Sequence, residues 1–343
     1  MKALVLREYG RFVYEDVEEP AIQPDEVLVE VRACGICGSD VHGMDGSTGR
    51  RIPPVIMGHE ASGVVARVGA AVKGWKDADR VCFDSMIWCG TCWHCRRGET
   101  NLCDNRRVLG VSCADYRRHG AFARYVAVPD RILVRVPDGV SFDHAALAEP
   151  LSVAFHAVRL GGARVGESAL VVGAGMIGLL ILQVLRAAGC SPVIVADVDA
   201  GKLGRARDGG ADAALDPSDP GFRQAVLDRT DGRGADLSLE AVGVSAALDT
   251  ALASVRKGGR VVMVGNVSPR VDLALQSAVT REVALLGSCA SQGEYAACLD
   301  LISSGRVDVD PLISARAPLS EGAQWFERLH RREPGLMKVV LQP

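Results

Sequence analysis

The first part of the chain, to about residue 130, consists mostly of short apolar runs separated by turn-forming residues. In several of these runs apolar and polar residues alternate, which is the period of a half-buried β-strand, and each run is bounded by Gly, Pro or Asp. The clearest runs cover residues 25–35, 60–69, 79–84 and 121–128. This part of the chain is therefore predicted to form a small β-rich domain.

The apolar period changes to that of an α-helix between residues 141 and 162. Ser141 is a residue type that commonly caps a helix N-terminus, and a glycine pair supplies the stop. Glu149 and Pro150 lie inside the stretch, and a proline interrupts helical hydrogen bonding. We expect a helix that breaks at this dipeptide and joins the β-rich part to a different kind of domain.

Strand-like and helical segments alternate after this helix. Buried-strand patterns occur at residues 168–172, 192–199, 235–243 and 259–265, and an apolar helical pattern follows the first of them. Such alternation is typical of βαβ units, whose strands are parallel. The predicted fold class is α/β, with a doubly wound parallel sheet in this part of the chain.

The sequence GAGMIG, residues 173–178, follows the first of these strands and opens the helix. In a dinucleotide-binding turn, Gly173 would allow a tight bend, Gly175 would let a pyrophosphate approach the helix N-terminus, and Gly178 would let helix and strand pack closely. Asp197 ends the next strand. A glycine-rich turn without a ligand would leave Asp197 unexplained, so the sequence predicts a dinucleotide site.

The same aspartate bears on which dinucleotide is bound. Lys202, Arg205 and Arg207 follow it closely, and their positive charge leaves the choice open. A carboxylate at Asp197 would accept hydrogen bonds from an adenosine ribose and repel a 2′-phosphate. NAD is therefore favoured over NADP.

Composition narrows the class of protein further. The chain has 343 residues, 48% of them hydrophobic and 24% charged, which suits a globular protein of two domains. Its formal net charge of −3 gives no basic footprint for nucleic acid, so the expected ligands are small molecules and metals. We see no secretory signal and no apolar run of about 20 residues, and we expect a cytoplasmic protein that does not enter the membrane.

The chain contains eleven cysteines. Thiols stay reduced in the cytoplasm, so metal binding, catalysis or core packing is favoured over disulfides. Cys89, Cys92, Cys95 and Cys103 lie in one short stretch, where four thiolates can converge on a tetrahedral zinc ion. A full set of protein ligands has no open position for substrate, so this zinc is predicted to be structural.

A second group of metal-binding residue types lies at turns between the predicted strands. Cys37 belongs to CGICGSDVH, and His59 and Glu60 belong to GHE, a mixed set of S, N and O donors that suits a catalytic zinc. Taken singly, Cys37 could be a core thiol or the redox partner of Cys34, and His59 could be a buried histidine with satisfied hydrogen bonds. Their occurrence together beside a nucleotide fold favours the zinc site.

The motifs GICGSD, GHE, EPLSVAFH, GAGMIG and MKVVLQP, with the four-cysteine stretch, resemble the zinc-dependent medium-chain dehydrogenase/reductases along essentially the whole chain. The chain is most similar to the polyol dehydrogenase branch, which includes sorbitol and galactitol-1-phosphate dehydrogenases. The resemblance implies a GroES-like catalytic domain made of residues 1–151 and 289–343. It also implies a Rossmann dinucleotide-binding domain made of residues 152–288.

By this resemblance, Cys37, His59 and Glu60 are the ligands of a catalytic zinc, and Glu149 contacts the metal's water or takes its place. Cys37 and Glu60 would together neutralise the divalent cation. With the four-cysteine stretch, the resemblance implies two zinc ions per chain. Glu149 could equally be a solvated helix residue.

Two routes for the substrate's proton stay open. Ser39 and His42 occupy the positions of a proton relay in alcohol dehydrogenases that this chain resembles. Glu149 is the alternative base, because a carboxylate near a metal can take a proton directly.

The resemblance implies hydride transfer from a secondary alcohol of a polyol or sugar alcohol, phosphorylated or not, to NAD. An amino-alcohol oxidation like that of L-threonine 3-dehydrogenase is the alternative on the same fold. A zinc-stabilised nucleotide-binding protein without catalysis is the alternative from another class. The stretch GSCASQGEY, residues 287–295, has small residues where sorbitol dehydrogenases resembling this chain carry an Arg-Tyr pair, so the resemblance does not single out sorbitol.

Two further features concern ligands and partners. Arg50 and Arg51 lie in a loop that either binds a phosphate or carboxylate or is simply solvated. Residues 270–276 alternate like an edge strand that could pair across a two-fold axis. We therefore expect a homodimer or homotetramer.

Overall fold

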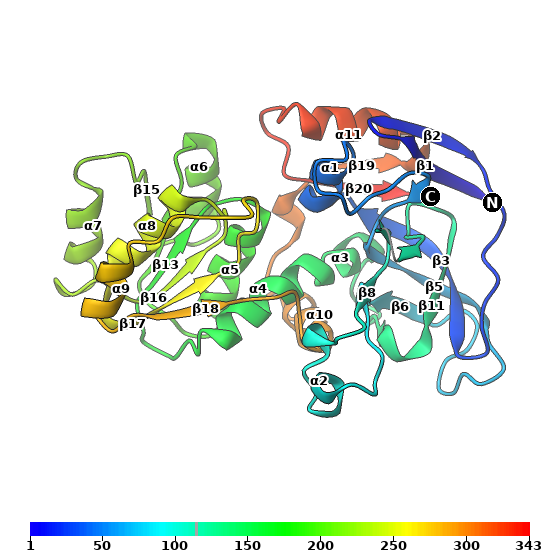
Figure 1. The fold of residues 1–343 in the computed structure, drawn as a ribbon, viewed down its shortest axis with the longest axis horizontal. Coiled ribbons are helices and arrows are strands. Elements are labelled where there is room, and N and C mark those ends of the chain that lie inside the picture. The colour runs from blue at the N-terminus through cyan, green and yellow to red at the C-terminus, as the bar shows by residue number, and fades with distance from the viewer. Residues whose placement is uncertain (114–115) are drawn as a thin grey trace. The chain divides into compact units, whose positions relative to one another are not determined.

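The structure, a computed structural model, describes residues 1–113 and 116–343, which form two units (Figure 1). Residues 1–149 and 292–343 make the first unit, and residues 150–291 make the second. The sequence places the boundaries after residues 151 and 288, and the structure places them after residues 149 and 291. Within the described ranges, no helix has both the length and the apolar character needed to cross a membrane.

The first unit is rich in strands, as the alternating pattern predicts, and most of its strands pair antiparallel. Its main sheet has the order β12-β6-β5-β3-β20-β19, with β11 also paired to β3, and a smaller sheet has the order β2-β1-β4. The strands of these sheets are β1 (Lys2–Glu8), β2 (Arg11–Asp16), β3 (Glu26–Gly35), β4 (Val55–Ile56), β5 (Glu60–Val68), β6 (Arg80–Phe83), β11 (Tyr125–Pro129), β12 (Leu133–Arg135), β19 (Ile313–Pro318) and β20 (Lys338–Gln342).

Shorter elements connect and cover these sheets. The short strands are β7 (Met86–Ile87), β8 (Arg107–Val108), β9 (Val111–Ser112) and β10 (Arg117–Arg118). The helices of the first unit are α1 (Gly38–Gly43), α2 (Trp93–Arg96), α3 (Phe142–Ala146), α10 (Tyr295–Ser303) and α11 (Gly322–His330), with 3₁₀ turns η1 (Thr100–Leu102), η2 (Asp130–Ile132), η3 (Asp310–Leu312) and η4 (Leu319–Glu321).

The last strand of the chain closes the first unit. Strand β20 runs antiparallel to β3, with Leu341 opposite Cys34 and Val340 opposite Gly35. Figure 1 shows this C-terminal strand, in red, among the blue strands of the N-terminus. The pairing brings the C-terminal segment beside the residues that lead into α1, where the candidate metal ligands begin.

An apolar core fills the space between the sheets and α11 of this unit. Phe326 of α11 is fully buried, stacks on Phe12 with ring centroids 4.3 Å apart, and meets Phe122 edge-on at 5.6 Å. Burying one such side chain contributes about 1.5–3 kcal/mol. Alternate residues of β3 join this core, as a period of two requires, whereas residues 3–6 of β1 are all buried in it.

The second unit is a parallel sheet in the order β15-β14-β13-β16-β17-β18. Numbered from its own first strand, this is the order 3-2-1-4-5-6 of a doubly wound dinucleotide-binding sheet, so the predicted fold class is confirmed. The strands are β13 (Ala169–Val172), β14 (Val193–Ala196), β15 (Ala213–Leu215), β16 (Ala235–Glu240), β17 (Val255–Met263) and β18 (Ala284–Gly287). The helices are α4 (Ala148–Leu160, beginning in the first unit), α5 (Met176–Ala187), α6 (Ala200–Asp208), α7 (Phe222–Asp228), α8 (Ser245–Ser254) and α9 (Leu275–Thr280).

Two predicted details are wrong. The helical stretch after Ser141 breaks at Leu147, between α3 and α4, and Pro150 lies in the first turn of α4, where its missing N–H removes no helical bond. Residues 270–276 do not form a strand: they run without strand pairing into α9, and the outermost strand is β18. Their alternating pattern meets no neighbouring strand, since Val271 and Leu273 remain exposed.

Candidate functional site

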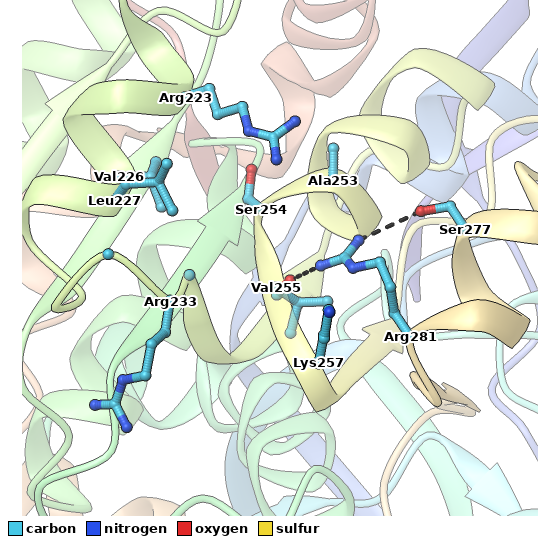
Figure 2. A pocket seen from close by; sticks show the side chains of 12 residues that line it. Arg223, Val226, Leu227, Arg233, Ala253, Ser254, Val255, Lys257, Ser277 and Arg281 are labelled. Carbon is cyan, nitrogen blue, oxygen red and sulfur yellow. Dashed lines mark hydrogen bonds between the residues drawn. The ribbon is translucent and has the colours of Figure 1, made fainter.

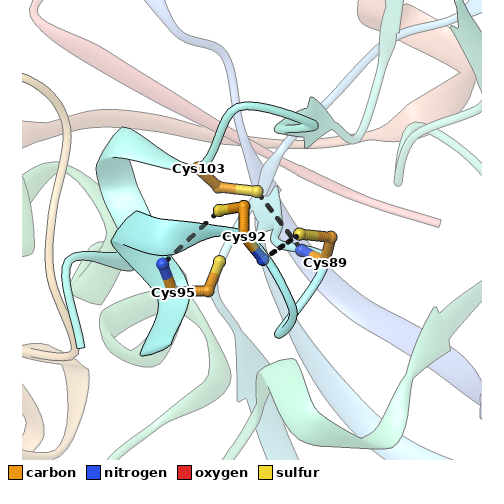
Figure 3. Close-up of side chains that lie close together, drawn as sticks. All are labelled: Cys89, Cys92, Cys95 and Cys103. Carbon is orange, nitrogen blue, oxygen red and sulfur yellow. Dashed lines mark hydrogen bonds between the residues drawn. The ribbon is translucent and has the colours of Figure 1, made fainter. Parts of the chain in front are cut away.

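The four cysteines at residues 89–103 converge on one point (Figure 3). The sulfur atoms of Cys89, Cys92, Cys95 and Cys103 all lie within 4.8 Å of one another. Cys92 caps the short helix α2, where its sulfur accepts a hydrogen bond from the Cys95 N–H at 3.5 Å. The helix turn therefore brings the second and third cysteines to the same side of the loop.

Backbone and side-chain donors surround these sulfur atoms. The N–H groups of Cys92 and Cys89 donate to the sulfurs of Cys89 and Cys103 at 3.4 and 3.3 Å. Hydrogen bonds, of which the one from the Thr91 side chain contributes most, lower the pKa of Cys89 to about 5. Desolvation raises the pKa of Cys95 to about 12. A soft divalent cation would stabilise all four as thiolates, so the donor set fits a closed tetrahedral zinc site.

The second cluster joins two separate turns of the first unit. Ligand atoms of Cys37, His59 and Glu60 lie within 4.8 Å of one another. Cys37 is the N-cap of α1, and its sulfur accepts hydrogen bonds from the Ser39 N–H and hydroxyl at 3.4 and 3.3 Å. Gly58 has φ of +93° just before the pair, a backbone turn that favours glycine and directs His59 and Glu60 inward.

Glu60 makes a buried ion pair that sequence reasoning missed. The Nζ of Lys338, at the start of β20, donates to Glu60 Oε1 and Oε2 at 2.8 and 2.6 Å and to the Ile36 carbonyl at 3.0 Å. Glu60 is 1% exposed and Lys338 is 3% exposed. Burial favours the neutral amine, but the charge of Glu60 outweighs it and raises the pKa of Lys338. Glu60 would therefore share its oxygens between Lys338 and any bound metal.

His59 is held by a second set of buried charges. Its Nδ1 lies 3.4 Å from Asp40 Oδ2, an ion-pair contact rather than a well-formed hydrogen bond. Arg51 donates from Nη2 and Nε to Asp40 Oδ1 at 2.9 and 3.3 Å. Burial alone would raise the pKa of Asp40 and lower that of His59, but their mutual attraction shifts both the other way, and Arg51 lowers the pKa of Asp40 further. Because Nδ1 faces Asp40, Nε2 is left for the metal cluster.

Glu149 lies near this cluster without joining it. It is the second residue of α4, and the Ser85 hydroxyl donates to its Oε1 at 3.3 Å. Burial raises the pKa of Glu149 to about 7, with His59 opposing and Glu60 adding to the rise. Glu149 is half-buried and lies close enough to His59 and Glu60 for their charges to shift its pKa, so it is not a freely solvated helix glutamate.

Ser39 and His42 lie one turn apart on α1, and both are exposed. The Ser39 hydroxyl donates to the Cys37 sulfur, and the His42 carbonyl accepts from the Ser47 hydroxyl at 2.8 Å. Across the described residues, no hydrogen bond links the two side chains of the predicted relay. Ser39 in this structure supports the thiolate.

Two other expectations from the sequence are changed by burial. The guanidinium of Arg51 is committed to Asp40, so Arg51 cannot serve as a loop residue that binds a substrate phosphate. Cys34 is fully buried, and burial raises its pKa well above the usual range, which makes it a core thiol rather than a redox partner of Cys37. The partner of His59, Asp40, lies in the GICGSD motif and could have been found from the sequence. No motif in the sequence pointed to Lys338 as the partner of Glu60.

The glycine turn has the geometry that its sequence predicts. Gly173 has φ of +99°, and a Cβ on Gly178 would lie 1.7 Å from the Gly173 carbonyl oxygen, so both positions need glycine. Gly175 is the N-cap of α5, and a Cβ there would meet no atom within 4 Å. The turn therefore leaves the helix N-terminus open to a phosphate group.

Asp197 lies directly after β14 and faces this turn. Its Oδ2 accepts from the Ala174 N–H at 2.7 Å, and its Oδ1 accepts from the Asp199 N–H at 2.9 Å. The Nζ of Lys202 is 3.9 Å from Oδ2, the outer limit of an ion pair. The carboxylate thus occupies a fixed position beside the glycine turn, with a distant cation.

Comparisons with known proteins agree with this geometry. Residues 23–138 match the alcohol dehydrogenase GroES-like domain, and residues 177–304 match the zinc-binding dehydrogenase family. The chain is 34% identical to D-xylulose reductase A of Aspergillus niger, covering 98% of this chain and 96% of that protein. It is 32% identical to sorbitol dehydrogenase of Bacillus subtilis (strain 168), covering 100% and 97%. The crystal structure of galactitol-1-phosphate dehydrogenase from Escherichia coli superposes with a TM-score of 0.92 at 28% identity, covering all of both chains.

The two clusters predict two zinc ions per chain with different roles. We expect Cys37→Ser to keep one zinc and the fold but to lose activity by several orders of magnitude, since an inner ligand is removed. Cys95→Ser should lose the other zinc and lower the melting temperature by about 5 °C or more. Metal analysis, circular dichroism and turnover measure these effects. A fully active enzyme with one zinc per chain would contradict the two-site assignment.

Proposed function

Because the chain belongs to the zinc-dependent medium-chain dehydrogenase/reductases, we propose that it oxidises a secondary alcohol group of a polyol or sugar alcohol and transfers the hydride to NAD. The observation that carries the proposal is the buried cluster of Cys37, His59 and Glu60 with Glu149 beside it. The names of the relatives support a polyol as the substrate class.

The residues of the cluster divide the chemical work. Zinc held by Cys37, His59 and Glu60 would act as a Lewis acid that lowers the pKa of a substrate hydroxyl. Asp40 holds His59 in one orientation, and Lys338 holds Glu60. Ser39 donates to the sulfur of Cys37 and so supports its thiolate form.

Glu149 is our candidate for the group that accepts the hydroxyl proton. Its carboxyl is half-buried and accepts a hydrogen bond from the Ser85 hydroxyl, which orients one of its oxygens. Ser39 is the weaker candidate, because its hydroxyl is directed to Cys37 and, over the described ranges, makes no bond to His42. The glycine turn at residues 173–178 and Asp197 would hold the dinucleotide, whose nicotinamide would supply the hydride acceptor.

A substrate screen tests the proposed reaction directly. NAD reduction would be followed over a set of polyols, their phosphates and L-threonine, with metal-free protein as the control. Turnover of polyols above L-threonine supports the proposal. Turnover of L-threonine alone would replace it with amino-alcohol oxidation.

Replacing Glu149 by Gln separates the two proton routes. The amide keeps the shape but cannot accept the proton, so kcat should fall on the order of 10²-fold or more while zinc content and NAD affinity stay near wild type. In the wild type, kcat should rise with pH as Glu149 ionises, and the variant should lose this dependence. Ser39→Ala is the matched variant. A wild-type kcat in Glu149→Gln across the pH range would assign the proton to Ser39 and His42.

The position of Asp197 supports NAD rather than NADP. Replacing it by Ala removes the negative charge beside the glycine turn and leaves Lys202 without its partner, so the kcat/KM ratio of NAD to NADP should fall at least about tenfold. Asp199→Ala, a neighbouring acidic residue that caps α6, is the control and should leave the ratio near wild type. An unchanged ratio in Asp197→Ala would show that this carboxylate does not face the ribose.

We further propose that the chain forms homodimers or homotetramers through the outer edge of the parallel sheet. The last strand of this sheet, β18, is partly exposed. In the segment that joins β17 to β18, Val267, Leu275 and Val279 are between 63% and 65% exposed. Open strand edges with apolar neighbours favour pairing. Sedimentation velocity should give a dimer or tetramer mass, and Val279→Glu should shift it towards the monomer. A monomeric wild type would refute this assembly.

A further inference from the structure

The second unit contains a pocket that lies apart from the glycine turn (Figure 2). Its volume is about 390 Å³, and its walls come from α7, the loop before β16, the end of α8, the start of β17 and the end of α9. Among the described residues that line it, Arg223, Arg233, Lys257 and Arg281 are basic and none is acidic. In a chain with more acidic than basic residues, this pocket gathers positive charge.

The pocket opens at the opposite edge of the sheet from the dinucleotide turn. Gly234 and Val255 line it, and these residues lie immediately before and at the start of β16 and β17. Gly173 follows the last residue of β13, which is parallel to both strands of this region. The positive pocket is therefore at the N-terminal edge of the sheet and does not belong to the dinucleotide site.

Two of the basic residues have structural partners. Arg281 donates to the Leu252 carbonyl at 2.8 Å, to the Ser277 hydroxyl at 3.3 Å and to the Val255 carbonyl, so it ties α9 to the end of α8. Arg233 pairs with Asp231 at 3.1 Å. These contacts give Arg281 a structural role and place a carboxylate beside the charge of Arg233.

Arg223 and Lys257 are not explained in this way. Over the parts of the chain that the structure describes, neither side chain makes a hydrogen bond or an ion pair. Arg223 is the second residue of α7, where a positive charge opposes the helix dipole rather than complementing it. Desolvation, and then the charge of Arg223, lower the pKa of Arg281, so the two guanidinium groups are close enough to repel. The charge of Arg223 beside Arg281 therefore raises the energy of the empty pocket.

We propose that this pocket binds a small dianion, either inorganic phosphate or the phosphate group of an organic phosphate ester. Arg223 and Lys257 would supply the charge, and the buried Ser254 on the pocket wall would supply a hydroxyl donor. The volume exceeds what one phosphate needs and lies in the range of small-molecule sites, which leaves room for the organic part of an ester. Binding would remove the repulsion between the cations and stabilise the second unit.

Inorganic phosphate is the probe for the test. The melting temperature of the zinc-loaded enzyme, kept saturated with NAD so that the dinucleotide site is filled, would be measured in phosphate and in chloride at equal ionic strength. At a phosphate concentration ten times its Kd, the wild type should melt about 3 °C higher than in chloride. The double variant R223Q/K257Q should lose most of this rise, because both unpaired cations are gone.

Matched variants separate binding from general effects. R164Q/R270Q removes two exposed cations of the same unit outside the pocket and should keep the full rise, which controls for net charge and for the general stabilisation by phosphate. Arg223 and Lys257 are exposed and lie outside the proposed catalytic residues, so R223Q/K257Q should fold and turn over like the wild type. An equal rise in R223Q/K257Q and the wild type, or no rise in the wild type, would overturn the proposal.

Pyrophosphate and glycerol 3-phosphate, compared next, would distinguish a bare phosphate site from one for esters.

Discussion

The buried ion pair between Glu60 and Lys338 is the constraint on which the first unit depends. Two charges that are almost fully inaccessible to water are tolerable only while they face each other, and removing one partner of such a pair typically costs about 3–5 kcal/mol. Glu60 begins β5, whereas Lys338 begins the last strand of the chain, 278 residues later. The same ammonium also holds the Ile36 carbonyl, next to Cys37. The C-terminal strand therefore supplies the charge that holds one of the candidate metal ligands.

This pairing also decides the charge of the cluster. Cys37 and Glu60 alone would neutralise a divalent cation, as expected from the sequence, but Lys338 already compensates Glu60, and Arg51 compensates Asp40. The thiolate of Cys37 then supplies one net negative charge among these groups. A divalent cation would favour the ionised form of Glu149, which supplies a second. A cation and an ionised base would thus stabilise each other, and the base would be ready when the metal is in place.

The sequence predicted most of what local pattern and spacing determine. The strands at residues 25–35 and 60–69, the doubly wound order and the convergence of the four cysteines all follow from period, turn residues or short loops. What it could not predict depends on contacts between distant segments. Lys338 looks like an ordinary residue of a strand, Arg51 like a loop cation, and residues 270–276 like a strand, because burial and pairing are not visible in a local period.

The two edges of the parallel sheet in the second unit differ in the charged groups that lie along them. At the C-terminal edge, the N-terminus of α5 is open, so an anion can approach that helix. Two backbone N–H groups fix Asp197 nearby, and its negative charge would repel a second anion beside it. At the N-terminal edge, α8 ends, and Arg281 donates to the Leu252 carbonyl in the last turn of that helix. The charges of Arg223 and Lys257 are not used in this way. A surplus of cations at an edge where helix carbonyls are already satisfied costs stability in the isolated chain, and it is offset only when an anion is present. The two edges can therefore bind different anions without competing for the same groups.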